Sequence, residues 1–87
     1  MRFEPLASYE RSLKKLDPAV KEKVKEAINT YVDFFESGQR PYGLGLKKLT
    51  SHIWEIRVDL KMRVMFRFEG DLVQWGYVGS HDDIINF

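Results

Sequence analysis

Apolar residues recur at helical spacing between Asp17 and Gly38. Asp17 and Pro18 stand where an N-cap and a first helical residue are expected, and Gly38 supplies a stop. The apolar positions between them follow the period of a helix with one buried face: Val20, Val24, Ala27, Ile28, Tyr31, Phe34 and Phe35. The pattern predicts a helix over about residues 18–37.

A shorter helix is predicted ahead of this one. Tyr9, Leu13 and Leu16 mark one helical face, and Ser8 is the candidate N-cap. The residues before Ser8 are predicted to form a short strand, which Pro5 confines to the edge of a sheet.

Apolar and polar residues alternate through the last third of the chain, as they do in strands with one buried face. Three strands are predicted, at about residues 53–58, 62–68 and 72–78. Residues 38–50 hold three glycines and a proline, which predicts a loop. We therefore expect an α+β fold, in which an N-terminal helical hairpin packs on one face of a small, mainly antiparallel twisted sheet of about four strands.

The register of the first hairpin follows from its apolar faces. Only a three-residue connection at residues 59–61 places both apolar sets on one side of the sheet, and it pairs Ile56 with Val64. Arg57 then lies directly opposite Arg63.

A two-residue turn at Gly70-Asp71 sets the register of the second hairpin. It pairs Val64 with Tyr77, which assigns Tyr77 to the core and places Val78 beside Arg63. The expected core face is rich in aromatic residues: Trp54, Ile56, Phe66, Phe68, Trp75 and Tyr77.

Positive charge collects on the opposite face of the predicted sheet. Arg57, Arg63 and Arg67 lie there, with Lys61 at the turn. Like charges directly opposite each other destabilise a sheet by up to about 1 kcal/mol, so a bound anion favours the arrangement. Guanidinium forks match phosphate oxygens, and we hypothesise a phosphate-binding face. The alternative is a surface ion-pair network neutralised by Glu55, which is diagonal to both Arg63 and Arg67.

Composition narrows the classes of function. With 44% hydrophobic and 31% charged residues, the chain has the make-up of an ordinary globular domain, which we place at residues 1–87. The net charge is only +1, so a nucleic-acid role must rest on a local patch. The lack of cysteine excludes thiolate chemistry and Cys-based zinc sites and suits a cytoplasmic location. No segment approaches the apolar length of a membrane span.

His81 follows the last predicted strand by three residues, near the end of the sheet that carries the arginine pair. Histidine has a reference pKa of about 6.5, so it can donate or accept a proton at neutral pH. It is either a catalytic group or a surface residue bonded to a carboxylate such as Asp82. Lys47 and Lys48 either extend the basic track or are solvated loop residues.

The order of elements and three segments resemble the RelE/ParE toxin superfamily of bacterial and archaeal toxin–antitoxin systems. These segments are WEIRV at residues 54–58, Arg63-Val64-Met65-Phe66, which is similar to the family's Arg-Leu-Val-Tyr pattern, and Gly79-Ser80-His81-Asp82. The resemblance covers almost the whole chain and implies the RelE-like fold.

RelE-type members are ribosome-dependent endoribonucleases that cleave mRNA in the ribosomal A site, and the resemblance implies this activity. Arg63 matches the arginine that stabilises charge on the scissile phosphate, and Arg57 matches a second basic position. His81 matches the general acid of the YafQ-like branch. Glu55 stands where RelE has a lysine and Phe87 where RelE has a tyrosine, and these departures favour a YafQ-like or YoeB-like site.

Further roles follow from the basic face and from the chemistry that such cleavage needs. The expected substrate-binding residues are Lys47, Lys48, Lys61 and Arg67. Glu55 and Asp82 are the candidates for a general base or an orienting group, and the scheme needs no metal and no cofactor. The expected partners are a cognate antitoxin, held in a toxin–antitoxin hetero-oligomer, and mRNA. Two alternatives stay open: a ParE-like inhibitor that binds DNA gyrase without cleaving RNA, and an inactive member that serves only as a binding partner.

Overall fold

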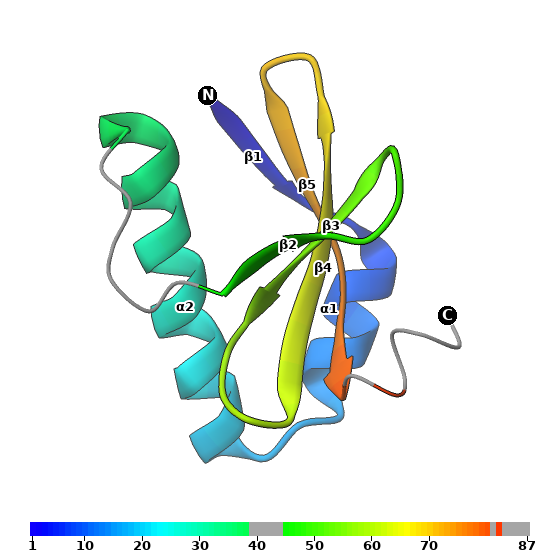
Figure 1. Ribbon diagram of the computed structural model, residues 1–87. Coiled ribbons are helices and arrows are strands. Elements are labelled where there is room, and N and C mark those ends of the chain that lie inside the picture. The colour runs from blue at the N-terminus through cyan, green and yellow to red at the C-terminus, as the bar shows by residue number, and fades with distance from the viewer. Residues whose placement is uncertain (39–44, 81, 83–87) are drawn as a thin grey trace.

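Two helices and a five-stranded sheet make up the part of the chain that the computed structural model describes, residues 1–38, 45–80 and 82. The elements are β1 (Arg2–Pro5), α1 (Ala7–Lys14), α2 (Pro18–Ser37), β2 (Leu46–Lys48), β3 (Ile53–Arg57), β4 (Met62–Glu69) and β5 (Leu72–Ser80). The strand order is β1-β5-β4-β3-β2, with β1 and β5 parallel and all other neighbours antiparallel (Figure 1). The expected α+β class and the mainly antiparallel sheet are confirmed. The short edge strand predicted before Ser8 is present as β1, so the helical hairpin follows a strand and does not open the chain. The sheet has five strands instead of about four because β2 was not predicted.

The long helix α2 begins and ends as the sequence predicts. Asp17 occupies the N-cap position with an extended backbone, and Pro18 is the first helical residue. Gly38 ends the helix with a φ of 75°, and its N–H donates to the carbonyl of Phe34 at 2.8 Å. Glycine adopts this left-handed conformation without a steric cost, which explains why the helix ends there.

The short helix α1 is tied to β5 by two serine hydroxyls. Leu6, and not the predicted Ser8, occupies the N-cap position. The Ser8 hydroxyl instead donates to the carbonyl of Gly76 at 2.6 Å, while the Ser12 hydroxyl accepts the N–H of Val78 at 3.0 Å. The helix is therefore positioned by its contacts with the sheet.

The first hairpin has the predicted register, with Ile56 opposite Val64 and Arg57 opposite Arg63. The strand β2 was not predicted, because it lies within the segment assigned to a loop. It pairs with β3 and places Lys47 opposite Glu55. A strand of three residues beside a glycine-rich segment is too short to show an alternating pattern.

A β-bulge corrects the predicted register of the second hairpin. The expected pairing holds as far as Trp75 and then shifts by one residue at Gly76. Beyond the bulge Tyr77 pairs with Met65 and Val78 takes the core position. The prediction for Tyr77 was wrong because a one-residue slip moves every later side chain to the other face.

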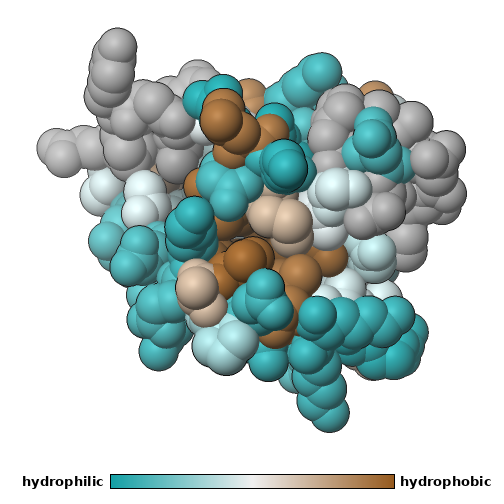
Figure 2. All heavy atoms as spheres, turned by 90° about the horizontal axis from the view of Figure 1, so that it is seen from below, coloured by the Kyte–Doolittle hydropathy of each residue, from teal (hydrophilic) through white to brown (hydrophobic). Residues whose placement is uncertain are grey.

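Both helices cover the same face of the sheet and share one core with it. The buried apolar residues of this core are Tyr9, Val24, Tyr31, Ile56, Val64, Phe66, Val73, Trp75 and Val78. Seen from below in Figure 2, apolar residues gather in the middle of this face of the molecule, with hydrophilic residues around them. Among the described residues, no helix is both long enough and apolar enough to cross a bilayer.

Candidate phosphate-binding site

A hollow of about 380 Å³ lies over β2, β3 and β4, on the sheet face that the helices leave uncovered. Its charged lining residues are Lys47, Glu55, Arg57 and Arg63, and Gly45 and Leu46 complete it. Three cations and one carboxylate therefore border the same hollow. This excess of positive charge suits an anion.

Arg63 is held in a fixed position at this hollow. Its Nη1 donates to the carbonyl oxygens of Asp59 at 2.6 Å and Met62 at 3.1 Å. Its Nε lies 3.7 Å from Oε1 of Glu55, and the side chain is only 16% exposed. A guanidinium that is already oriented can stabilise developing charge without reorganisation at the moment of reaction.

The turn between β3 and β4 keeps the acceptors of Arg63 in place. One Asp59 carboxylate oxygen accepts the backbone N–H groups of Lys61 and Met62, both at 2.8 Å. Hydrogen bonds from Met62 and then Lys61, with a smaller contribution from Lys23, lower the pKa of the Asp59 carboxyl. The carboxylate therefore stabilises the backbone shape that Arg63 requires.

Arg57 is exposed and lies directly opposite Arg63. Its stem packs across Gly45, where an added Cβ would lie 2.7 Å from the Arg57 Cβ and 3.2 Å from its Nε. Only glycine leaves this room for the arginine. Within the described part of the chain, the Arg57 guanidinium makes no hydrogen bond or ion pair. Its donors are therefore available to a ligand there.

Glu55 is buried, with 4% of its surface exposed, in the middle of the face where the sequence suggested a surface network. It lies opposite Lys47 on one neighbouring strand and Met65 on the other. Its contact with Arg63 agrees with the predicted diagonal ion pair. The burial indicates that this carboxylate belongs to the support of Arg63.

Two of the predicted basic residues lie away from the hollow. Lys48 is on the helix-covered face at the sheet edge, where its Nζ lies 5.6 Å from the centre of the Trp54 ring. Arg67 is farther along β4, and its Nε donates to Gln74 at 2.6 Å. The structure therefore groups Lys47 with the arginine pair and separates Lys48 and Arg67 from it.

The remaining candidates lie near the turn and the end of β5. Lys61 is exposed in the turn. Gly79, on β5, lies opposite Arg63, where the sequence had predicted Val78. Asp82 is exposed, and His81 lies outside the described residues.

Sequence reasoning missed the contributions of Gly45 and Asp59. The available signal was the Asp59-Leu60-Lys61 turn, because aspartate at a turn often accepts the N–H two residues later. Across the described ranges, no group of three or more His, Asp or Glu side chains is arranged to hold a metal ion.

No family model and no curated protein matches this sequence. Several solved structures are similar to it over nearly their full length. The RelB–RelE antitoxin–toxin complex from Methanococcus jannaschii matches with a TM-score of 0.72 at 16% identity, covering 95% of each chain. The E. coli DinJ–YafQ complex matches with a TM-score of 0.69 at 13% identity, covering 97% of this chain and 98% of that one. The YoeB/ParE toxin from Agrobacterium tumefaciens matches with a TM-score of 0.68 at 18% identity, covering 93% and 99%. At these identities the likeness establishes the fold, which is the RelE-like fold implied by the sequence resemblance.

Proposed function

We propose that this chain is the toxin of a toxin–antitoxin pair and that it is an endoribonuclease cleaving mRNA in the ribosomal A site. The observation that carries the proposal is the arginine pair, in which Arg63 is fixed and Arg57 is exposed beside the same hollow. The fold shared with the RelE, YafQ and YoeB toxins supports it.

The proposed reaction uses the RNA's own 2′-hydroxyl as the nucleophile. The 2′-oxygen attacks the adjacent phosphorus and the bond to the 5′-oxygen breaks, which leaves a 2′,3′-cyclic phosphate and a 5′-hydroxyl. A general base takes the proton of the 2′-hydroxyl, and a general acid gives a proton to the departing oxygen. Negative charge builds up on the phosphorane between these steps, so fixed cations lower the barrier.

The two arginines have separate tasks in this scheme. Arg63 already has its orientation and lies beside the buried Glu55, so we assign it to the charge that develops in the transition state. Arg57 is exposed and free to form a bidentate contact, so we assign it to the phosphate of the bound RNA. Lys47 adds a positive charge at the same hollow.

His81 is the proposed general acid, and Asp82 is the candidate to orient it. Histidine is suited to this task because its reference pKa of about 6.5 is close to neutral. The burial of Glu55 and its contact with Arg63 favour an orienting role for this carboxylate over a role as the base, which must reach the 2′-hydroxyl.

A cognate antitoxin is part of the proposal. Two of the compared structures are complexes of a toxin with its antitoxin. An acidic segment of such a partner would complement the cations around the hollow and neutralise them while bound.

The test is induced expression in bacteria, with growth and mRNA 5′ ends measured in the same cells. Wild type should stop growth and produce new mRNA ends, and His81→Ala should abolish both. Arg57→Gln should reduce cleavage about tenfold to a hundredfold, because it removes a charge-assisted contact to the phosphate, which contributes about 1.5–3 kcal/mol. Lys48→Gln is the matched control, because it removes one charge from the opposite face of the sheet.

Each other outcome contradicts part of the proposal. Growth arrest with intact mRNA, unchanged in His81→Ala, would refute the nuclease and favour a ParE-like inhibitor of DNA gyrase. Normal growth with well-folded wild-type protein would refute the toxin assignment and leave an inactive binding partner.

A further inference from the structure

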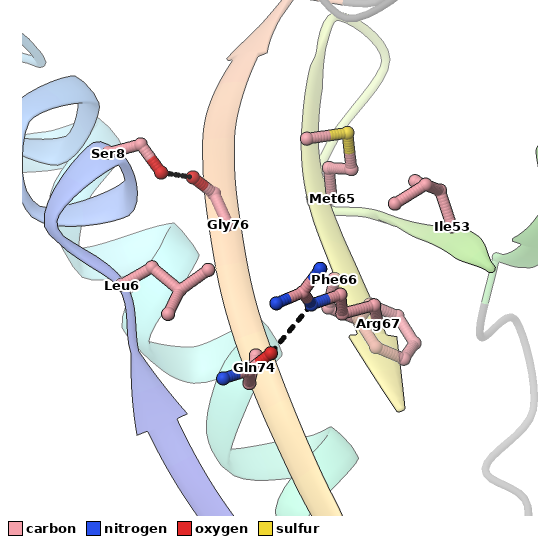
Figure 3. Close-up of a pocket in the computed structure, with 8 residues that line it drawn as sticks. All are labelled: Leu6, Ser8, Ile53, Met65, Phe66, Arg67, Gln74 and Gly76. Carbon is pink, nitrogen blue, oxygen red and sulfur yellow. Dashed lines mark hydrogen bonds between the residues drawn. The ribbon is translucent and has the colours of Figure 1, made fainter. Parts of the chain in front are cut away.

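A second hollow lies on the same sheet face, next to Arg67. Its volume is about 200 Å³. Its lining is mostly apolar, and its polar side chains are Ser8, Arg67 and Gln74 (Figure 3). The other lining residues are Leu6, Ile53, Met65, Phe66 and Gly76. The hollow therefore combines an apolar surface with one cationic fork.

A chain of hydrogen bonds across three strands fixes this fork. The Gln74 amide nitrogen donates to Glu4 at 2.9 Å, which turns the amide oxygen toward β4. That oxygen accepts the Nε of Arg67 at 2.6 Å, as the dashed line in Figure 3 shows. The relay occupies Nε and leaves the two terminal nitrogens of Arg67 without another hydrogen bond among the residues that the structure describes. Arg67, which is itself exposed, thus presents its two terminal nitrogens as donors in the orientation that the contact with Gln74 favours.

The chemistry of the hollow favours a nucleobase over a phosphate group. A phosphate placed against apolar walls with one cation would lose water that the site does not replace. A base has flat faces suited to apolar contact and to stacking on a guanidinium plane, and it carries its polar groups at the edge. Among the bases, guanine presents two adjacent acceptors, O6 and N7, which match the fork of arginine.

We propose that this hollow binds a guanine base of the RNA substrate, that Arg67 reads the base, and that Gln74 and Glu4 position Arg67. The inference rests on the proposed function, because the RNA must also reach the arginine pair. Arg67 lies four residues along β4 from Arg63, about 13 Å at the rise of a strand. A single strand of RNA covers this distance in a few nucleotides, so one strand can occupy both hollows.

The test is direct binding of short oligouridylates that carry one guanine, adenine or cytosine at the same position. All 2′-hydroxyls are methylated, so that binding is measured without cleavage, and fluorescence anisotropy is recorded at one fixed low salt concentration. Wild type should bind the guanine oligomer at least about tenfold more tightly than the others, the discrimination expected of a bidentate contact. Arg67→Lys keeps the charge but lacks the fork, so it should lower the affinity for the guanine oligomer to the level of the other two.

The positioning role has its own variant and control. Gln74→Met removes the acceptor of the Arg67 Nε at similar size, and it should reduce the guanine preference severalfold while Arg67 itself is retained. Arg11→Lys, an exposed position on α1, is the matched control and should keep the full preference. Equal melting temperatures for the four proteins would show that folding is not the cause of the differences.

The outcomes separate this inference from the proposed function. A guanine preference that survives in Arg67→Lys overturns the role of Arg67. Equal binding of all oligomers overturns the base site and leaves the nuclease proposal standing. A guanine preference in a protein that cleaves no mRNA supports the base site while the nuclease proposal fails. Binding of none of the oligomers overturns the base site together with direct recognition of RNA.

Discussion

Replacing Asp59 with alanine removes two backbone hydrogen bonds of the β3–β4 turn at once. The carboxylate accepts the N–H groups of Lys61 and Met62 at 2.8 Å each. A charge-assisted hydrogen bond contributes about 1.5–3 kcal/mol in favourable settings, but this side chain is 31% exposed, so we take about 1 kcal/mol for each. The ion pair with the exposed Lys23 adds less than about 0.5 kcal/mol. We therefore expect the free energy of unfolding to fall by about 2 kcal/mol, which corresponds to a melting temperature lower by about 8–16 °C.

The effect of this substitution depends on pH in a direction that the pKa shift fixes. Folding lowers the pKa of Asp59, so the folded state favours the charged form. The stabilisation is fully present above the unfolded pKa of about 3.9, and it is lost as the pH falls through the lower folded value. The difference between wild type and Asp59→Ala should therefore be constant near neutral pH and shrink in acid.

The assay is urea unfolding at pH 7 and in acid, and it compares wild type with Asp59→Ala and Asp59→Asn. Asparagine keeps an acceptor oxygen without the charge, so Asp59→Asn should lose less stability than Asp59→Ala. Lys23→Gln is the control for the ion pair and should change stability by no more than about 0.5 kcal/mol. A loss below about 0.5 kcal/mol in Asp59→Ala, or a loss of the same size at both pH values, would refute the reasoning.

Three further substitutions test the site and the core. Glu55→Ala leaves Arg63 largely buried beside an empty position, so urea unfolding should show a loss of about 3 kcal/mol; no loss would mean that the contact is not structural. Gly45→Ala places a Cβ 2.7 Å from that of Arg57, so we expect the free energy of unfolding to fall by about 1–3 kcal/mol. RNA binding in the anisotropy assay should also weaken. Unchanged values for both would contradict the close packing. Val24→Ala leaves a cavity at a fully buried position, so the free energy of unfolding should fall by about 2 kcal/mol. RNA binding should not change, and an altered affinity would mean that the core is coupled to the site.

The arginine pair could be predicted from the sequence because two constraints acted together. The alternation of β3 and β4 defined which side chains share a face, and the length of the turn then left one register that buried both apolar sets. Arg57 had to lie opposite Arg63 as a result. The second turn fixed the register of β4 and β5 as far as Trp75 in the same way.

The bulge in β5, the edge strand β2 and the burial of Glu55 could not be predicted in this way. Gly76 bends β5 where its carbonyl meets the Ser8 hydroxyl, and this contact joins residues that are far apart in the sequence. The pattern of β3 places Glu55 on the face away from the helices, but alternation does not tell how deeply a face is covered. Lys48 was grouped with Lys47 because β2 was not predicted. Without a strand, the sequence did not indicate that these two neighbouring side chains lie on opposite faces of the sheet.

The parallel pairing of β1 with β5 has a consequence for the order of events when the chain is made. Arg2 forms an ion pair with Asp71 at 3.1 Å, and the N–H of Leu6 donates to the carbonyl of Trp75 at 2.9 Å. Among the strands that the structure describes, the first to be synthesised therefore pairs with the last. Contacts between such distant segments form late and slow the folding of a domain. The sheet can be completed only after β5 has been made, so β1 waits for its partner while all the strands between them are synthesised.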